Sequence, residues 1–238
     1  MMSESSNVDA GEIEKFAQLA SRWWDPTSEF KPLHQINPLR LGFIQEQVAL
    51  AGQQVLDVGC GGGLLCEPMA AAGAQVTGID MAEASLSVAR LHLLESGLAV
   101  DYQQTTAEQL AATQPESFDV VTCLEMLEHV PDPVAVVQAC HDLVRPGGLV
   151  FFSTLNRNLK SYLFAIIGAE YVLGLLPKGT HDYQQFIRPS ELARWSRTAG
   201  LQLVQQTGLT YNPFTRRYRL NAQDLDVNYL VVMQRQAA

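Results

Sequence analysis

The feature that most constrains the fold is a short apolar strand that runs into a glycine-rich turn, at residues 55–63. The segment reads Val-Leu-Asp-Val-Gly-Cys-Gly-Gly-Gly, and an apolar, helix-like stretch follows it. A turn without side chains lets the backbone approach a ligand closely, and the free amides of the next helix then point at that ligand. A second acid, Asp80, ends the next apolar run at a distance where a carboxylate can hydrogen-bond a ribose. The pattern predicts a nucleoside-type cofactor.

The spacing of the glycines separates this turn from other nucleotide-binding turns. The dinucleotide pattern G-x-G-x-x-G fails, because its third position holds Leu64 when counted from Gly59 and Cys66 when counted from Gly61. The P-loop also fails, since no Lys-Ser or Lys-Thr pair follows. An acid two residues ahead of the turn, Asp57, suits a cationic ligand better than a pyrophosphate. The alternative is a turn that only connects a strand to a helix.

Length and charge narrow the classes of protein. A chain of 238 residues with 47% hydrophobic content fits one α/β domain with a large core. The net charge of −9 argues against a nucleic-acid partner, and the small basic cluster Arg216-Arg217 with Arg219 is interpreted as a solvated loop. The four cysteines form no CxxC pair, which indicates a reduced, cytoplasmic protein. The polar N-terminus shows no secretory signal.

Helical and extended patterns alternate along the chain. We expect an N-terminal helix that starts at Asp9 with Glu12 in a capping box, and a second helix that starts at Asn37-Pro38 with the asparagine as its cap. The expected strands lie near 54–58, 75–79, 99–103, 118–123, 148–154, 201–207 and 227–233, and the helices between them near 63–72, 82–96, 106–112, 133–144 and 189–200. This order predicts an α/β fold, a doubly wound, mostly parallel seven-stranded sheet.

The predicted topology also locates the ligand. In open α/β sheets the ligand lies beyond the carboxyl ends of the strands, where the strand order reverses. We expect the strand that ends at Val58 to neighbour the strand that ends at Cys123, so the loop 124–131 borders the cofactor. Residues 1–50 are expected to form a helical cap on a cofactor-binding domain of residues 51–238.

The chain resembles a known family in several further segments. The turn with its acid is similar to motif I of the class I S-adenosylmethionine-dependent methyltransferases, and Phe118-Asp119-Val120-Val121 and the run 143–148 are shared by many of their members. The flanks resemble the ubiquinone-biosynthesis O-methyltransferases more specifically. The matching segments are 21–25, 30–34, 36–40, 153–158, 177–182 and 226–229. The likeness covers nearly the whole chain.

This resemblance implies a Rossmann-like fold and S-adenosyl-L-methionine as the methyl donor. It implies two O-methylations of ring hydroxyls on polyprenylated phenols and catechols in ubiquinone biosynthesis, the 2-polyprenyl-6-hydroxyphenol methylase and 3-demethylubiquinol 3-O-methyltransferase activities. It also implies a peripheral location on the inner membrane and a complex with other ubiquinone-biosynthesis proteins. The rival interpretations are a methyltransferase of another small hydrophobic phenol or amine, a non-catalytic S-adenosylmethionine-binding scaffold, and a nicotinamide oxidoreductase.

Six positions are expected to contact the cofactor: Arg40, Asp57, Gly59, Gly61, Asp80 and Leu124. Gly59 would let the backbone approach, and Asp80 would accept both ribose hydroxyls through its two oxygens. Arg40 would bind the carboxylate bidentately, with a surface helix residue as the alternative. Asp57 would favour the ammonium or order the turn, and Leu124 would act through its backbone and by packing.

The acceptor hydroxyl also needs help to lose its proton, since a phenol resembles tyrosine with a pKa near 10. Glu125, Glu128 and His129 would share one face of a helical turn, as a general base or as ligands of a divalent cation such as Mg²⁺. With a metal there, chelation would lower activity and magnesium would restore it. The alternative is that Glu128 and His129 organise the loop and cap the next helix. His181 with Asp182 is a second candidate acid–base pair, or else a hydrogen-bonded loop.

The segment 156–182 is an insert that a minimal fold does not need. Its apolar part, 159–176, is interrupted by Lys160 and Glu170 and is shorter than the roughly 20 apolar residues of a spanning helix. A lid over an apolar pocket, a helix at the membrane interface or an ordinary buried helix all fit it. An interfacial helix would make the protein float with anionic liposomes. Upstream, Phe16, Trp23 and Trp24 are interpreted as core packing, with closure of the site as the alternative.

Overall fold

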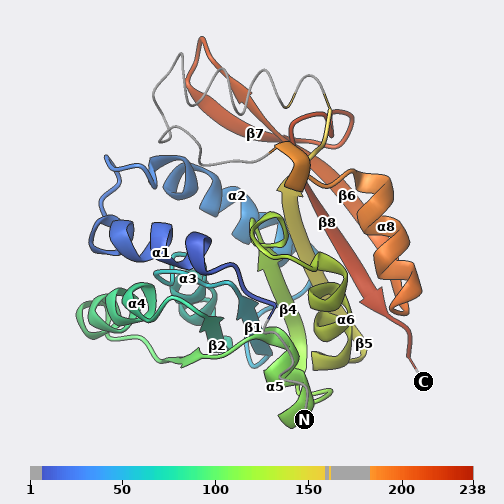
Figure 1. The fold of residues 1–238 in the computed structure, drawn as a ribbon, viewed down its shortest axis with the longest axis horizontal. Helices are drawn as coiled ribbons and strands as arrows, with labels where there is room; N and C mark the ends of the chain where they lie inside the picture. The colour runs from blue at the N-terminus through green and yellow to red at the C-terminus, as the bar shows by residue number, and fades with distance from the viewer. Residues whose placement is uncertain (1–6, 159–160, 162–182, 238) are drawn as a thin grey trace.

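The protein is built on one eight-stranded sheet that helices cover on both faces. The computed structural model describes residues 7–158, 161 and 183–237. The strand order is β3-β2-β1-β4-β5-β8-β6-β7 (Figure 1). The neighbours from β3 to β5 are parallel, and β8, β6 and β7 continue the sheet in antiparallel pairs. The doubly wound, Rossmann-like fold is therefore confirmed, with one strand more than predicted.

The parallel half of the sheet follows the predicted order. Its strands are β1 (Gln54–Val58), β2 (Gln75–Asp80), β3 (Val100–Gln104), β4 (Phe118–Leu124) and β5 (Val144–Leu155). The antiparallel half consists of β6 (Leu201–Asn212), β7 (Arg217–Asn221) and β8 (Asn228–Arg235). Val58 of β1 pairs with Cys123 of β4, as expected, so the strand order reverses beside the glycine turn.

The helices between the strands lie close to their predicted ranges. They are α3 (Cys66–Ala71), α4 (Glu83–Ser96), α5 (Ala107–Thr113), α6 (Pro133–Leu143) and α8 (Pro189–Thr198), with short 3-10 turns η2 (Leu127–His129) and η4 (Tyr183–Gln185). Gly97 closes α4 in the left-handed conformation at φ +68°, where a residue without a Cβ is least strained.

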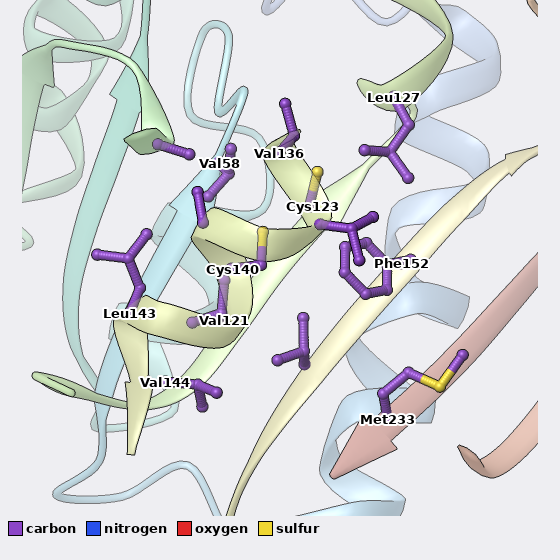
Figure 2. Packing of buried hydrophobic residues seen from close by; sticks show 14 of the residues in the cluster. Val58, Val121, Cys123, Leu127, Val136, Cys140, Leu143, Val144, Phe152 and Met233 are labelled. Carbon is purple, nitrogen blue, oxygen red and sulfur yellow. The ribbon is translucent and has the colours of Figure 1, made fainter. Parts of the chain in front are cut away.

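Two cores form because successive strand residues point to opposite faces of the sheet. Val121 and Phe152 face α5, α6 and α8, and Figure 2 shows them packed with Cys140 and Leu143 of α6. Their neighbours Val120 and Phe151 face α2, α3 and α4 on the other side. Strands buried on both faces are the reason for the long apolar runs in the sequence.

The N-terminal helices differ from the prediction. After α1 (Ala10–Leu19) and η1 (Ala20–Arg22), helix α2 runs over Lys31–Gln47, so it begins six residues before Asn37 and contains Pro38 in its interior. Asn37 is not a cap, because its side-chain amide donates to the carbonyl of Leu64 at 2.5 Å. At α1 the Asp9 side chain accepts from the amides of Gly11 and Glu12, whereas the Glu12 side chain turns to other partners, so the capping box is half formed.

The first turns of the chain pack over the glycine-rich turn. Trp23, Phe30 and Leu64 form a small buried cluster with Phe16 and Trp24 at its edge. The Trp23 ring lies so close that a Cβ on Gly61 would come within 2.2 Å of it. The aromatic residues therefore pack together as expected, and they do so beside the predicted cofactor turn. The division at residue 50 stays a prediction.

No helix in the described ranges 7–158 and 183–237 combines the length and the apolar character that crossing a membrane requires. Most of the predicted insert 156–182, including the apolar part 159–176, lies outside the described residues.

Candidate active site

A cavity of about 890 Å³ opens at the carboxyl ends of β1 and β4, a size that suits a small-molecule site. Its walls come from α1, α2, the glycine-rich turn, the loop after β4 and the β6–β7 hairpin. The predicted site residues that line it are Arg40, Asp57, Gly59, Gly61, Asp80, Leu124, Glu125, Glu128 and His129. His181 lies outside the described residues, so its predicted role stays a prediction.

The glycine-rich turn is held against the end of β2 by backbone hydrogen bonds. The amides of Gly59 and Cys60 donate to the carbonyl of Ile79 at 2.9 and 3.0 Å. Gly59 has φ +73°, and a Cβ there would stand 2.6 Å from the Met126 side chain. Only glycine meets both conditions, so the backbone of the turn lines the cavity directly.

Asp80 fastens the turn from the other side. Its Oδ2 accepts from the amide of Gly61 at 2.9 Å, and its Oδ1 accepts from the amide of Ala82 at 2.8 Å. Burial raises the pKa of this carboxyl above its ordinary value, and the two amides partly offset that effect. Each carboxylate oxygen can accept a second hydrogen bond, so Asp80 has acceptor capacity left on the cavity wall.

Asp57 is buried at the end of β1. Its Oδ1 accepts from the Thr122 hydroxyl at 2.6 Å, and its Oδ2 accepts from the Cys66 thiol at 3.3 Å. Burial raises its pKa to about 6, against these hydrogen bonds and the charge of Arg40. Both oxygens thus bond to the strand and helix on either side, which is the geometry of a residue that orders the turn.

Arg40 projects from α2 into the same cavity and is only 6% exposed, so the alternative of a surface helix residue is wrong. Its Nη2 lies 2.8 Å from Oε1 of Glu125. Nε and Nη2 of Arg40 are nevertheless buried without a hydrogen bond of good geometry to any described residue. Buried donors normally have partners, so Nε, which unlike Nη2 has no acceptor nearby among the described residues, marks a place for an acceptor from a ligand.

Glu125 follows β4 in a left-handed conformation, φ +53°, that few residues other than glycine adopt. Its carboxylate accepts from the Ser153 hydroxyl at 2.7 Å and the Asn228 amide at 3.0 Å, besides the ion pair with Arg40. Burial alone would raise its pKa, but the charge of Arg40 and these hydrogen bonds outweigh burial and lower it. Glu125 is therefore an ionised counterion of Arg40.

Glu128 stands in a different environment. It is 3% exposed, and its Oε2 accepts from the Thr154 hydroxyl at 2.8 Å. Its Oε1 is buried beside the cavity without a partner among the described residues. Burial, together with the charge of Glu125, raises the pKa of Glu128 to about 7. A carboxyl with a pKa near neutrality and a free oxygen can take up or release a proton at working pH.

His129 ties the loop after β4 to the N-terminal helix. Its Nδ1 lies 2.8 Å from Oε2 of Glu12, and the Phe16 ring meets the imidazole edge-on at 5.3 Å. Burial acts to lower the pKa of His129, but the hydrogen bond to Glu12 and the nearby carboxylates raise it above its ordinary value. The same pair lowers the pKa of Glu12 to about 2. The result is a charged pair that holds α1 over the cavity.

Glu125, Glu128 and His129 do not fit a divalent cation as they are arranged. Glu125 has left-handed backbone and precedes η2, so the expected single helical face does not form. The three side chains bond to separate partners, and the described part of the chain contains no group of three acidic, histidine or cysteine side chains that could hold a metal. The prediction that these three side chains would meet at one point rested on the assumption that residues 125–129 form a regular helix.

Several functional partners were not predicted from the sequence. Glu12, Asn228 and Ser153 each bond to a predicted site residue from a distant part of the chain. Thr122 and Thr154 carried a weak signal, since each has a fully buried hydroxyl in a mostly apolar stretch of its strand. A hydroxyl there needs a partner, and a carboxylate from a neighbouring element provides it.

A doubly wound sheet with an acid-flanked glycine turn at its switch point defines a class I methyltransferase. Residues 33–206 match the family described as "Methyltransferase domain". The magnesium protoporphyrin IX methyltransferase of Synechocystis PCC 6803, solved with bound SAH, shares the fold at a TM-score of 0.68 and 20% identity, covering 94% of each chain. A possible histamine N-methyltransferase of Thermotoga maritima also reaches 0.68, at 16% identity over 95% of this chain and 99% of that one.

Much higher sequence identity links the chain to one group of these enzymes. The ubiquinone biosynthesis O-methyltransferase of Stutzerimonas stutzeri is 69% identical and covers 95% of this chain and 97% of its own length. Its counterpart in Pseudomonas aeruginosa is 67% identical over 98% of this chain and the whole of its own. The chain belongs to the ubiquinone biosynthesis O-methyltransferase family.

Proposed function

We propose that this chain transfers the methyl group of S-adenosyl-L-methionine to ring hydroxyls of polyprenylated phenol and catechol intermediates, at both O-methylation steps of ubiquinone biosynthesis. The observation that carries the proposal is one cavity in which the unpartnered Nε of Arg40 and an unpartnered oxygen of Glu128 lie beside the glycine turn. The first feature suits the carboxylate of the donor, and the second suits the proton of the acceptor.

The residues proposed to hold the donor follow from their free hydrogen-bonding capacity. Arg40 would bind the amino-acid carboxylate through its free Nε, with Nη2 shared between that carboxylate and Glu125, and Asp80 would accept from the ribose hydroxyls. Gly59 and Gly61 would let the backbone approach, and Leu124 would pack against the adenosyl group. Asp57 would act mainly by ordering the turn, since its carboxylate is buried between Thr122 and Cys66, whereas Asp80 is partly exposed on the cavity wall.

When bound, S-adenosyl-L-methionine supplies a methyl group on a cationic sulfur, and the reaction forms an O–C bond as the C–S bond breaks. The cavity would align the acceptor oxygen with that bond, which supplies much of the acceleration. Glu128 Oε1 would accept the phenolic proton as the new bond forms. A phenol pKa near 10 against about 7 for Glu128 leaves a gap worth about 4 kcal/mol, small enough for transfer within the methyl-transfer step.

A metal is not part of this proposal, since the acidic loop does not fit one as arranged. The test is exhaustive EDTA treatment followed by addition of Mg²⁺. We expect unchanged turnover. Loss of activity that Mg²⁺ restores would mean that Glu125 leaves Arg40 to join Glu128 and His129 around a cation, and it would replace this account of the loop.

Radiolabelled methyl transfer to a short-chain prenylated catechol tests the activity. We expect turnover by the parent chain, a loss of about 100-fold or more in kcat for E128Q, and no change for E46Q, a matched substitution on the exposed side of α2. Equal rates on simple phenols without a prenyl chain would favour the rival substrate class. Calorimetric binding of S-adenosylmethionine without turnover on any acceptor would favour a scaffold.

Membrane contact by residues 159–176, a peripheral place on the inner membrane and a complex with other ubiquinone-biosynthesis proteins remain proposals from the family resemblance. A polyprenylated substrate supports them chemically, because its apolar tail partitions into lipid. Charged substitutions at Ile166 and Leu173 that abolish flotation with liposomes would support membrane contact by residues 159–176. Unchanged flotation would exclude that segment as the contact.

A further inference from the structure

The tip of the β6–β7 hairpin combines an exposed aromatic ring with a group of arginines. Phe214 is 96% exposed, and Arg216, Arg217 and Arg219 are exposed around it. The hairpin projects beyond the body of the molecule at the top of Figure 1. No carboxylate in the described part of the chain forms an ion pair with these arginines, in a protein whose net charge is −9. Neither feature is needed to build the fold.

The turn at the tip is ordered by its own hydrogen bonds. Oδ1 of Asn212 accepts from the amides of Phe214 and Thr215 at 2.9 and 3.1 Å. Below the turn, Tyr211 pairs with Tyr218 across the two strands, and their rings lie 4.8 Å apart. Phe214 is thus presented to solvent by a formed turn, which lowers the entropy lost when its ring is buried by a partner.

The two faces of β7 have different roles. Tyr218 and its partner Tyr211 line the cavity. Arg217 and Arg219 flank Tyr218 in an extended strand, so they point to the opposite, outer face. The hairpin is therefore a wall of the cavity on one face and a basic surface on the other, with an apolar residue at its tip.

We infer that this hairpin docks on an anionic lipid bilayer. Phe214 enters the membrane interface while Arg216, Arg217 and Arg219 contact the lipid phosphates. An aromatic ring with adjacent arginines is suited to that boundary, and the acidic remainder of the surface is repelled from it, so the protein approaches hairpin first. If the proposed function holds, docking sets the cavity wall against the bilayer and lets the prenyl tail stay in lipid while the ring reaches Glu128.

Co-sedimentation of the full chain with vesicles tests this inference. The vesicles contain equal amounts of phosphatidylcholine and phosphatidylglycerol, with pure phosphatidylcholine for comparison. We expect binding to the anionic vesicles, weakened by high salt, and little binding to the neutral ones. R217Q/R219Q should lower the partition coefficient about 30-fold, the loss expected for two arginines at an anionic surface. F214S should lower it about 10-fold, for partial burial of one aromatic ring.

Each control variant makes the same kind of substitution as a hairpin variant, at exposed residues elsewhere on the surface. L94S removes a leucine that is 81% exposed on α4, and R194Q/R197Q removes two exposed arginines from α8. Both should bind vesicles like the parent. Residues 159–176 are unchanged in every variant, so a selective loss belongs to the hairpin.

Three results would overturn the inference: no binding of the parent to anionic vesicles, equal binding by the hairpin variants, or an equal loss in the controls. Binding to a single-stranded oligonucleotide but not to vesicles would identify a nucleic acid instead. Calorimetry with S-adenosylmethionine separates this from the proposed function, because hairpin variants should bind the donor normally. Failure of donor binding in the parent would reject the function and leave the docking result standing.

Discussion

Replacing Glu128 by glutamine should raise the stability of the protein relative to the parent as the pH rises from 5 to 8, while it slows catalysis. The pKa of Glu128 is raised from its ordinary value of 4.5 to about 7, first by burial and then by the charge of Glu125. The unfolded chain ionises this carboxyl above about pH 4.5, whereas the folded protein ionises it only above about pH 7. Ionisation therefore favours the unfolded state, and folded stability is lost as the pH rises between these values.

The size of the effect follows from linkage. Near pH 8 the shift opposes folding by about 3.3 kcal/mol, and near pH 5 by about 0.8 kcal/mol, so the difference is about 2.5 kcal/mol. Glutamine does not titrate, and its carbonyl can keep the hydrogen bond from Thr154. Any fixed penalty for its buried amide group is the same at both pH values and cancels in the comparison.

Urea unfolding of the parent and E128Q near pH 5 and pH 8 measures this difference. The stability of E128Q relative to the parent should rise by about 2.5 kcal/mol between the two conditions. E46Q, at an exposed glutamate, should show almost no such change. A relative stability that is independent of pH would refute the raised pKa, and with it the assignment of Glu128 as the group that takes the phenolic proton.

Three further substitutions probe the turn and the cap. D80N should weaken S-adenosylmethionine binding about 10- to 100-fold in calorimetry, because one charged acceptor on the turn is lost; unchanged affinity would exclude Asp80 as a ribose contact. G61A should lower the free energy of unfolding by about 1–3 kcal/mol, because Gly61 has φ +53° and a Cβ would stand 2.2 Å from Trp23; an additive double-mutant cycle with W23A would contradict the steric part. E12Q should lower the pKa of His129 in an NMR titration, because the hydrogen bond to Glu12 is lost. In the parent, the pair stabilises the fold fully below about pH 6.5, and this stability is lost as the pH rises through the raised pKa of His129; E12Q should lack it. An unchanged His129 titration would show that Glu12 does not control that pKa.

Local patterns were enough to predict the parallel half of the sheet and the glycine-rich turn that lines the cavity. Strands buried on both faces are nearly continuous apolar runs, and Gly97 closes α4 by a conformation that depends on one residue. Asp57, Gly59 and Asp80 were also found locally, because strand, turn and next strand lie within one short segment of the chain.

Features that depend on tertiary packing could not be predicted. Helix α2 begins at Lys31 because its first turns pack against the buried Trp23 cluster, which outweighs the interior Pro38. Strand β7 was missed because Arg217 and Arg219 resemble a solvated loop, and its inward side chain, Tyr218, packs only once the hairpin forms.

In the site, the direction of each acidic side chain was the unpredictable part. Glu125 and Glu128 lie three residues apart, yet Glu125 is an ionised partner of Arg40, whereas the pKa of Glu128 is raised to about 7. Their partners, Asn228 and Thr154, come from strands far along the chain. A left-handed residue at position 125 breaks the helical spacing on which the metal hypothesis depended.

The position of β8 has a consequence for biosynthesis of the protein. Of the described strands it is the last to leave the ribosome, yet it fills the gap between β5 and β6 in the middle of the sheet. Until it is inserted, β5 presents an open edge and the β6–β7 hairpin has no neighbour to rest on, while Glu125 still lacks Asn228. Closure of the sheet and addition of Asn228 to the loop after β4 therefore occur in one step once β8 has emerged, and a nascent chain stalled before Asn228 would expose an unpaired strand edge to chaperones.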